Sequence, residues 1–275
     1  MLELPEVLTL SSQLAREVCG KTVREVLPPV KPHKFCWYEG DPADYSPQLN
    51  GARVLTSHGF GIYAALRFDN GCELCWNDGV NARLADSSAL PGAYQLAVTF
   101  TDGSALVFTV AMYGGIILHS GNYENEYYLK SLHSVPPLSP EFPAYFRKTF
   151  CESKPGLSVK AFLATQQRFP GIGNGVLQDI LFQSGLHPKR KLSTLNEQDQ
   201  IKLCRDITAV LTEMTECGGR DTEKDLYGKA GGYRTKMSKL SYPAPCPVCG
   251  GTIKKEAYLG GSVYYCPHCQ PLVME

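Results

Sequence analysis

The sequence lacks the features that mark membrane, secreted and highly charged proteins. No apolar run reaches the length that spans a bilayer, and the opening residues Met1 to Glu6 do not resemble a secretory signal. Lys and Arg number 27 and so do Asp and Glu, so the net charge of zero gives no sign of a nucleic-acid partner. The 275 residues predict a globular cytoplasmic protein of two domains with room for a small third module.

Cysteine is the residue type with the clearest pattern. Two Cys-x-x-Cys pairs, Cys246 with Cys249 and Cys266 with Cys269, are separated by sixteen residues. Each pair places two sulfurs on one turn, and four sulfurs close a tetrahedron around zinc without a position for water. The spacing predicts one structural Zn²⁺, although a disulfide pair or two redox motifs would use the same residues. The other seven of the 11 cysteines show no framework spacing, which suits a reducing cytosol.

The N-terminal half begins with a helix and continues in short strands. Residues 5–19 carry apolar side chains at helical spacing after Pro5, and Gly20 ends the pattern. From Thr22 to about His119, β-rich runs alternate with turn residues, as at 69–71 and 101–103. This half therefore predicts a β-sandwich or a barrel.

The C-terminal half is predicted to be helical. A proline-rich linker at 136–141 precedes helices expected at 157–169, 174–184 and 196–217. The segment from Asp221 to Ser238 is polar and rich in glycine, which predicts an exposed loop. From Cys151 onward, Lys and Arg number 16 against 12 Asp and Glu, a weak sign of a phosphate-binding face. The predicted domains are residues 1–135, 136–238 and 239–275.

A glycine-rich turn, Pro170-Gly-Ile-Gly-Asn-Gly175, lies between two of these helices. Glycine lets a backbone approach another chain closely, and the start of the next helix favours an anion. Asn174 could cap that helix or donate its amide to a phosphate. A plain helix–helix turn explains the same residues equally well.

Three segments together resemble one protein family. Residues 171–182 read GIGNGVLQDILF and resemble the GIGNxYxxEILF segment of the formamidopyrimidine-DNA glycosylase and endonuclease VIII family. The two cysteine pairs resemble its zinc finger, and residues 3–7 resemble its opening motif PELPEV. The matches come in family order and at family length, so the resemblance covers the whole chain.

The resemblance implies an α+β fold. It comprises an N-terminal β-sandwich flanked by helices and a C-terminal helix–two-turns–helix domain with a zinc-ribbon hairpin, with DNA bound in the cleft between. Asn174 matches an asparagine that contacts the phosphate at the lesion, Lys160 matches a lysine that reaches the DNA backbone, and Gly171 and Gly173 belong to the same turn. The implied partner is double-stranded DNA with damaged or abasic sites, bound by a monomer in the cytoplasm, or at the nucleoid if the chain is bacterial.

Family members remove an oxidised base and cut the abasic site, using the amine of an N-terminal proline and a neighbouring glutamate. In this sequence Leu2 stands at the proline position. A leucine there should hinder removal of Met1, so the α-amine of Met1 is the candidate nucleophile, one residue further from Glu3. Glu3 is the candidate proton carrier. Glu6 either assists or only caps its helix.

Further positions depart from the family pattern. Phe60 stands where a hairpin lysine belongs in the family, and His58 nearby could contact a phosphate or simply be solvated. Val80 and Tyr113 occupy the wedge positions that fill the space left by a flipped base. Gly261 replaces the arginine with which the family's zinc hairpin grips phosphate.

A group of charged residues follows Gly219 and has two interpretations. It covers an extruded base, as the region does in some relatives, or it is a solvated loop. The residues are Arg220, Asp221, Glu223, Lys224 and Asp225.

The sequence leaves three hypotheses for function. The first is a DNA glycosylase and abasic-site lyase, or a glycosylase that uses Glu3 and water without the lyase step. The second is a damage-recognition or structural DNA-binding relative that has lost the chemistry. A zinc-ribbon RNA-binding protein is the third, but it leaves the glycine-rich turn and the N-terminal motif unexplained.

Overall fold

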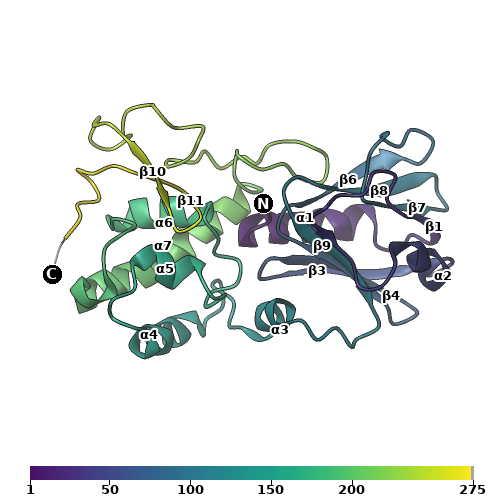
Figure 1. Cartoon of the computed structure of the whole chain (residues 1–275), viewed down its shortest axis with the longest axis horizontal. Coiled ribbons are helices and arrows are strands. Elements are labelled where there is room, and N and C mark those ends of the chain that lie inside the picture. The colour runs from purple at the N-terminus through teal and green to yellow at the C-terminus, as the bar shows by residue number, and fades with distance from the viewer. Residues whose placement is uncertain (274–275) are drawn as a thin grey trace. The chain divides into compact units, whose positions relative to one another are not determined.

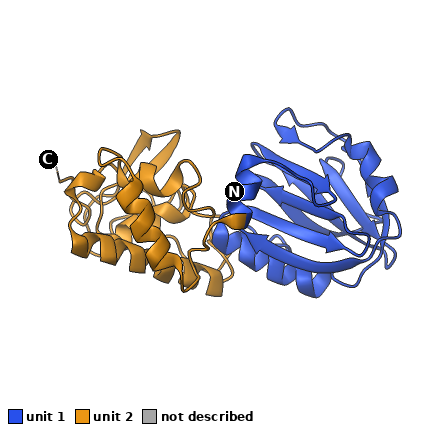
Figure 2. Cartoon of the chain, turned by 90° about the horizontal axis from the view of Figure 1, so that it is seen from below, with its two compact units in different colours: residues 1–132, 223–230 blue, residues 133–222, 231–275 orange. Residues whose placement is uncertain are grey.

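The structure is a computed structural model that describes residues 1–273 and divides into two compact units (Figure 2). Unit 1 comprises Met1–Leu132 and Glu223–Ala230, and unit 2 comprises His133–Thr222 and the chain from Gly231 onward. The segment Glu223–Ala230 thus packs with the N-terminal unit although it lies late in the sequence. The three-domain division by sequence stays a prediction.

Unit 1 is a sandwich of two β-sheets flanked by helices (Figure 1). One sheet has the strand order β2-β9-β5-β4-β3, and the other has the order β1-β7-β8-β6. The strands are β1 (Val23–Leu27), β2 (Cys36–Trp37), β3 (Val54–Phe60), β4 (Tyr63–Phe68), β5 (Glu73–Asn77), β6 (Val80–Asp86), β7 (Leu96–Phe100), β8 (Ser104–Val110) and β9 (Gly114–His119). The helices are α1 (Leu4–Glu17), η1 (Pro42–Asp44), α2 (Tyr45–Leu49) and α3 (Glu126–His133). The predicted β-sandwich with flanking helices is confirmed.

Local sequence explains the hairpins and the packing of unit 1. The turns between β4 and β5 and between β7 and β8 contain Gly71 and Gly103, whose φ angles are 86° and 87°. Trp76 and Phe108 meet edge to face in the core with ring centroids 4.9 Å apart. Helix α1 lies close to β3, because a Cβ added at Gly59 would come within 2.6 Å of the side chain of Val7.

Unit 2 is helical and ends in a two-stranded hairpin (Figure 1). Its elements are α4 (Phe142–Glu152), α5 (Val159–Ala164), α6 (Val176–Ser184), η2 (Leu192–Thr194), α7 (Glu197–Glu216), β10 (Lys254–Tyr258) and β11 (Gly261–Tyr265). Asn196 caps α7 by accepting a hydrogen bond from the backbone N–H of Asp199 at 2.8 Å. Throughout residues 1–273, no helix is long and apolar enough to cross a membrane.

Two sequence predictions about this half of the chain are wrong in detail. The helix expected at 157–169 stops at Ala164, because Gln166 and Gln167 have φ angles of 60° and 52° and turn the chain. The segment 221–238 forms no helix or strand, but it is not an exposed loop. Leu226, Tyr233 and Met237 are each at most 2% exposed, since apolar side chains anchor the segment.

Candidate zinc centre, hairpin surface and N-terminal site

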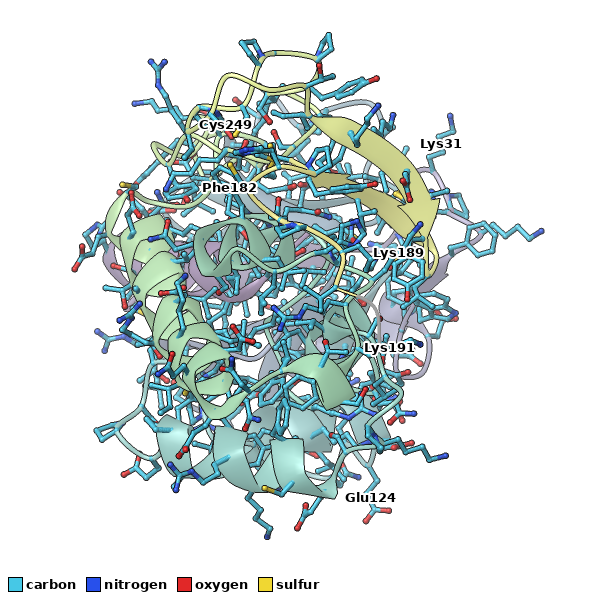
Figure 3. The ribbon with its side chains drawn as sticks, turned by 90° about the vertical axis from the view of Figure 1, so that its left-hand side faces the viewer. Lys31, Glu124, Phe182, Lys189, Lys191 and Cys249 are labelled. Carbon is cyan, nitrogen blue, oxygen red and sulfur yellow. The ribbon has the colours of Figure 1, made fainter. Side chains whose placement is uncertain are left out.

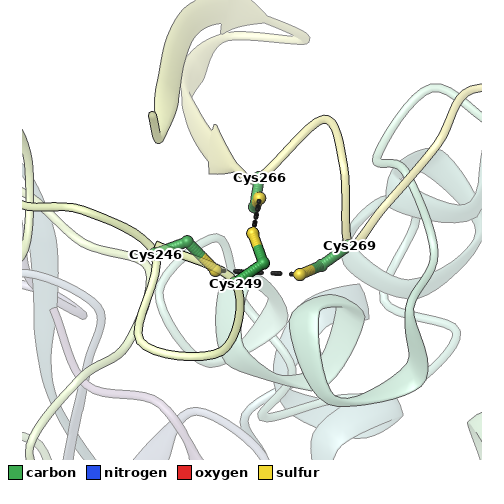
Figure 4. A group of neighbouring side chains, drawn as sticks. All are labelled: Cys246, Cys249, Cys266 and Cys269. Atoms are coloured by element: carbon green, nitrogen blue, oxygen red, sulfur yellow. Dashed lines mark hydrogen bonds between the residues drawn. The ribbon is translucent and has the colours of Figure 1, made fainter. Parts of the chain in front are cut away.

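The four predicted zinc ligands converge in unit 2 (Figure 4). Sγ of Cys246 lies 3.7 Å from Sγ of Cys269, and Sγ of Cys249 lies 3.5 Å from Sγ of Cys266. All four sulfurs lie within 4.8 Å of one another. A tetrahedron with Zn–S bonds of about 2.3 Å requires sulfurs about 3.8 Å apart, so the four side chains fit one structural zinc ion.

The zinc hairpin is docked on α6 by polar side chains. Strands β10 and β11 are joined at Leu259 and Gly260, whose φ angles of 48° and 73° make a tight turn. Asn174 and Gln178 each donate a side-chain N–H to the carbonyl oxygen of Ser262, at 3.0 Å. Gln178 also accepts the backbone N–H of Tyr264 at 3.0 Å. The glycine-rich turn and the hairpin therefore form one connected surface, which we call the hairpin surface: Lys160, Asn174, Gln178, Tyr258, Gly261 and Ser262.

Gly261 is tightly fitted within the hairpin surface. A Cβ at this position would lie 3.2–3.3 Å from the side-chain atoms of Asn174. The absence of the family arginine at this position therefore coincides with close packing of Asn174 against the hairpin. Oδ1 of Asn174 is a buried acceptor without a hydrogen-bond partner among residues 1–273, while the nitrogen of the same amide binds the hairpin.

Two lysines of unit 2, Lys160 and Lys189, bind the zinc hairpin. Lys160 is 2% exposed, and its Nζ donates to the carbonyl oxygen of Tyr258 at 2.6 Å. Burial lowers the pKa of Lys160 to about 8. Lys189, labelled in Figure 3, forms an ion pair with Glu256 of β10. Lys160 thus stabilises the hairpin through a buried hydrogen bond. Its contact with DNA stays a prediction.

The two glycines of the turn differ in their roles. Gly171 is buried and has a φ of 94°, a conformation that a side chain would strain. Gly173 is half-buried, and its carbonyl accepts the backbone N–H of Leu177 at 3.2 Å at the start of α6. Their predicted role at DNA is not tested by this geometry.

Glu3 and Glu6 form the N-terminal cap of α1 in unit 1. The side chain of Glu3 accepts the backbone N–H of Glu6, and the side chain of Glu6 accepts that of Glu3, at 3.3 Å for the second bond. They are 3% and 7% exposed. Both residues therefore cap the helix, and the catalytic roles predicted for Glu3 and Glu6 stay predictions.

The Met1 amine lies among carboxylates of unit 1. It forms an ion pair with Glu223 of the segment Glu223–Ala230, with 2.6 Å between N and Oε2. The backbone N–H of Leu2 donates to the carbonyl oxygen of Asp78 at 2.7 Å. Burial raises the pKa of Asp78, the Met1 amine lowers it and the nearby Glu3 raises it, and the net pKa is about 6. We call Met1, Glu3, Asp78 and Glu223 the N-terminal site.

The two predicted wedge residues are placed differently. Tyr113 is 37% exposed, and its hydroxyl lies 3.7 Å from the sulfur of Met1. Val80 is 1% exposed and belongs to the core of the sandwich, because it faces inward at the start of β6. In this conformation Val80 is not a wedge, so that prediction needs correction, whereas Tyr113 has the required exposure.

His58 and Phe60 are half-buried members of an aromatic cluster on the five-stranded sheet. Phe60 stacks between His58 and Tyr63, with ring centroids 5.3 and 5.6 Å away. Nε2 of His58 lies 3.4 Å from Glu73, which also receives hydrogen bonds from Arg67 and Tyr128, both at 2.8 Å. His58 therefore serves the packing of unit 1.

Glu73 also lies close to Cys75 and His119, a group that could hold a metal ion, but hydrogen bonds from Arg67 and Tyr128 already occupy both carboxylate oxygens of Glu73. Nδ1 of His119 accepts the backbone N–H of Gly121 at 3.1 Å, so a neutral ring carries its proton on Nε2, the atom nearest Glu73. Burial raises the pKa of Glu73, but His119, Arg67 and Tyr128 outweigh it and lower the value to about 2. The cluster is a buried ion network.

The sequence analysis missed three residues of these sites. Gln178 had a weak signal, a polar residue four positions after Asn174 near the start of a predicted helix. Asp78 sits in a turn, where an aspartate is ordinary. Glu223 appeared only within a charged loop, because nothing local shows that this segment returns to the N-terminus.

Two segments of the chain match known domain families. Residues 134–225 match the family model "Formamidopyrimidine-DNA glycosylase H2TH domain", and residues 245–272 match "Zinc finger found in FPG and IleRS". The chain is therefore a mixed α+β protein with a helix–two-turns–helix domain and a zinc finger of this type.

Full-length relatives then point to the family. The formamidopyrimidine-DNA glycosylase of Thermus thermophilus is 29% identical over 98% of both chains. The crystal structure of MutM (Fpg) from the same organism superposes with a TM-score of 0.81 at 26% identity, covering 99% of this chain and 100% of that one. Lactococcus lactis Fpg in complex with DNA containing an abasic site superposes with a TM-score of 0.83 at 21% identity, covering 98% and 99%. The chain thus resembles formamidopyrimidine-DNA glycosylases over its full length and shares the fold of their solved structures.

Proposed function

We propose that this protein is a DNA glycosylase with abasic-site lyase activity, and that the α-amine of Met1 is its nucleophile. The observation that carries the proposal is the position of that amine, which is paired with Glu223 at 2.6 Å. The carboxyl group of Asp78 lies close enough to both the Met1 amine and Glu3 for their charges to shift its pKa. The site thus combines an amine with several proton carriers, as Schiff-base chemistry requires.

The residues divide the work as follows. Glu223 accepts a proton from the ammonium, and the neutral nitrogen attacks C1′ of the opened sugar and forms a C–N bond. A carboxyl group with a pKa of about 6, that of Asp78, donates the proton with which the C1′ hydroxyl leaves as water. The resulting iminium withdraws electrons, so the Asp78 carboxylate, which has just given up its proton, removes a proton from C2′ and the 3′ phosphate leaves with the electron pair of its C–O bond. The hairpin surface of unit 2 is proposed to hold the phosphates, with Asn174 and the turn of the zinc hairpin in contact with the backbone.

Borohydride trapping on a duplex with an abasic site tests this proposal. The expected result is a covalent adduct whose peptide map places the DNA on Met1, and which is lost when the terminal amine is acetylated. Intact mass determines whether Met1 is retained. An adduct on an internal lysine, or tight binding with neither an adduct nor base release, would contradict the proposal.

A second candidate is a damage-recognition protein without the reaction. The observation in its favour is Phe60, which stacks in an aromatic cluster where the family pattern has a catalytic lysine. Tight binding to an abasic duplex with no adduct and no strand cleavage would select this candidate.

A further inference from the structure

Unit 1 exposes an aromatic patch that adjoins the N-terminal site through Tyr113, whose hydroxyl lies 3.7 Å from the sulfur of Met1. We define the aromatic patch as Phe35, Trp37, Met112 and Tyr113, which are 48%, 53%, 62% and 37% exposed. Several large apolar side chains exposed side by side usually mark an interaction surface.

The four side chains are contiguous because their backbones are paired. Strand β2 runs parallel to β9, with Cys36 opposite Gly114 and Trp37 opposite Gly115. The backbone N–H of Gly114 donates to the carbonyl oxygen of Phe35 at 3.0 Å. The rings of Trp37 and Tyr113 lie 6.4 Å apart at 55°. Since side chains alternate along a strand, Cys36 packs toward the core while its two aromatic neighbours face outward.

The turn that carries Met112 and Tyr113 is fixed. The backbone N–H of Gly79 donates to the carbonyl oxygen of Tyr113 at 3.0 Å, and that of Ala111 donates to Gly79 at 3.1 Å. A Cβ at Gly79 would lie 2.5 Å from the same carbonyl oxygen of Tyr113. The aromatic patch is therefore a preformed platform, which binds a flat ligand at a lower cost in entropy.

Charges of both signs lie beside the aromatic patch: burial and then the carboxylates of Asp78 and Glu3 raise the pKa of Tyr113, while lysines lie at the Phe35 end. Lys31 and Lys34 are exposed, and Nζ of Lys34 lies 5.4 Å from the centre of the Phe35 ring. Lys31 extends away from the ribbon in Figure 3. No acidic residue occurs between Glu25 and Glu39, although residues 1–132 contain 14 Asp and Glu against 9 Lys and Arg. Lysine beside exposed rings suits an anionic ligand with flat faces.

We infer that the aromatic patch binds the unpaired bases of a single-stranded DNA segment, with Trp37 and Tyr113 as stacking partners and Lys31 and Lys34 near the phosphates. Aromatic rings with adjacent cations form the usual platform for single strands, because every base has a face that can stack. The inference rests on the proposed DNA binding and adds that the preferred substrate has unpaired bases beside the lesion.

Tryptophan fluorescence tests the inference in the zinc-loaded full chain. The chain has two tryptophans, and Trp76 is 0% exposed in the core, so quenching by DNA reports Trp37. An oligothymidylate of about 12 nucleotides should quench the emission, whereas an equally long strand of abasic residues, with the same charge and no bases, should bind at least tenfold more weakly.

Trp37→Ala should weaken oligothymidylate binding about tenfold and Trp37→Phe much less. Leu55→Ala, at a residue 54% exposed on β3, is the matched control and should change nothing. Emission from Trp76 verifies that the Trp37→Ala variant is folded.

Three results would overturn the inference: equal binding of the abasic strand, no effect of Trp37→Ala, or emission that changes with protein concentration alone, which would indicate self-association. If an abasic duplex still binds and depends on Asn174, the inference fails and the proposed DNA binding stands. If neither the single strand nor the duplex binds, both fail.

Discussion

The hairpin surface of unit 2 and the N-terminal site of unit 1 differ in how well they match the family that the chain resembles. The hairpin surface depends on four sulfurs, a glycine turn and backbone carbonyls, and both matched family models fall almost entirely within its unit. The N-terminal site depends on individual side chains, and there Leu2 stands at the proline position, with Asp78 and Glu223 beside the amine.

The contrast separates two kinds of constraint. A surface built from metal ligands and main-chain hydrogen bonds tolerates substitution around it, because the backbone supplies most of its groups. A reacting centre changes its chemistry when one residue changes, since catalysis requires particular atoms within a fraction of an ångström. The same chain can therefore retain a binding surface and alter a reaction.

Loss of one zinc ligand should have the largest effect of the four substitutions. It would show how strongly the folding of unit 2 depends on bound zinc. We expect Cys246→Ser to release the zinc, because three sulfurs cannot close the site and metal binding contributes on the order of 10 kcal/mol to folding such modules. Zinc content by mass spectrometry should fall from one ion per chain to none. Cys151→Ser, at an exposed cysteine in α4, should retain one ion. Full zinc in the Cys246 variant would disprove the assignment of the ligands.

In unit 1, Glu73→Gln should show that stability comes from a buried ion network instead of a metal. The pKa of Glu73 is about 2 in the folded chain and ordinarily 4.5. Its contribution, about 2–3 kcal/mol, is therefore complete above pH 4.5 and lost as the pH falls toward 2. Urea unfolding of wild type and variant should differ by that amount at pH 7 and converge below pH 3. Glu124→Gln, at the exposed residue labelled in Figure 3, should change little; a gap that persists at low pH would contradict the network.

Asn174→Ala tests whether the hairpin surface binds duplex DNA. It removes the bond to Ser262 at 3.0 Å and the amide proposed to face phosphate, so duplex affinity should fall about tenfold, whatever the sequence of the duplex. Fluorescence anisotropy with several duplexes measures this. Asn50→Ala, at an exposed asparagine of unit 1, serves as the control. A loss confined to one sequence would contradict a backbone contact.

Gly261→Ala should have the smallest effect. The added Cβ would lie 3.2–3.3 Å from Asn174 and displace its side chain slightly, which should weaken duplex binding about threefold. In an Asn174→Ala background the same change should have no further effect, because the crowded group is gone. Ser262→Ala keeps the accepting carbonyl and should bind like wild type.

Much of this architecture could be predicted from local patterns. The two Cys-x-x-Cys pairs determine a zinc centre, because four sulfurs at that spacing have one closed geometry. Turn residues at 69–71 and 101–103 determine hairpins, and the apolar period determines α1 and α7 to within two residues. The helix at 157–169 was overestimated because periodicity does not reveal the positive φ angles at Gln166 and Gln167.

The sequence by itself determined the fold class, the zinc ligands and the position of the glycine turn, since each follows from residues near one another in the chain. Only the tertiary structure decided that Lys160 is buried beneath the hairpin, that Val80 is core, and that Glu223 meets the Met1 amine. Those facts depend on contacts between residues up to 222 positions apart. Burial and long-range pairing are properties of the packed chain, and no local pattern encodes them.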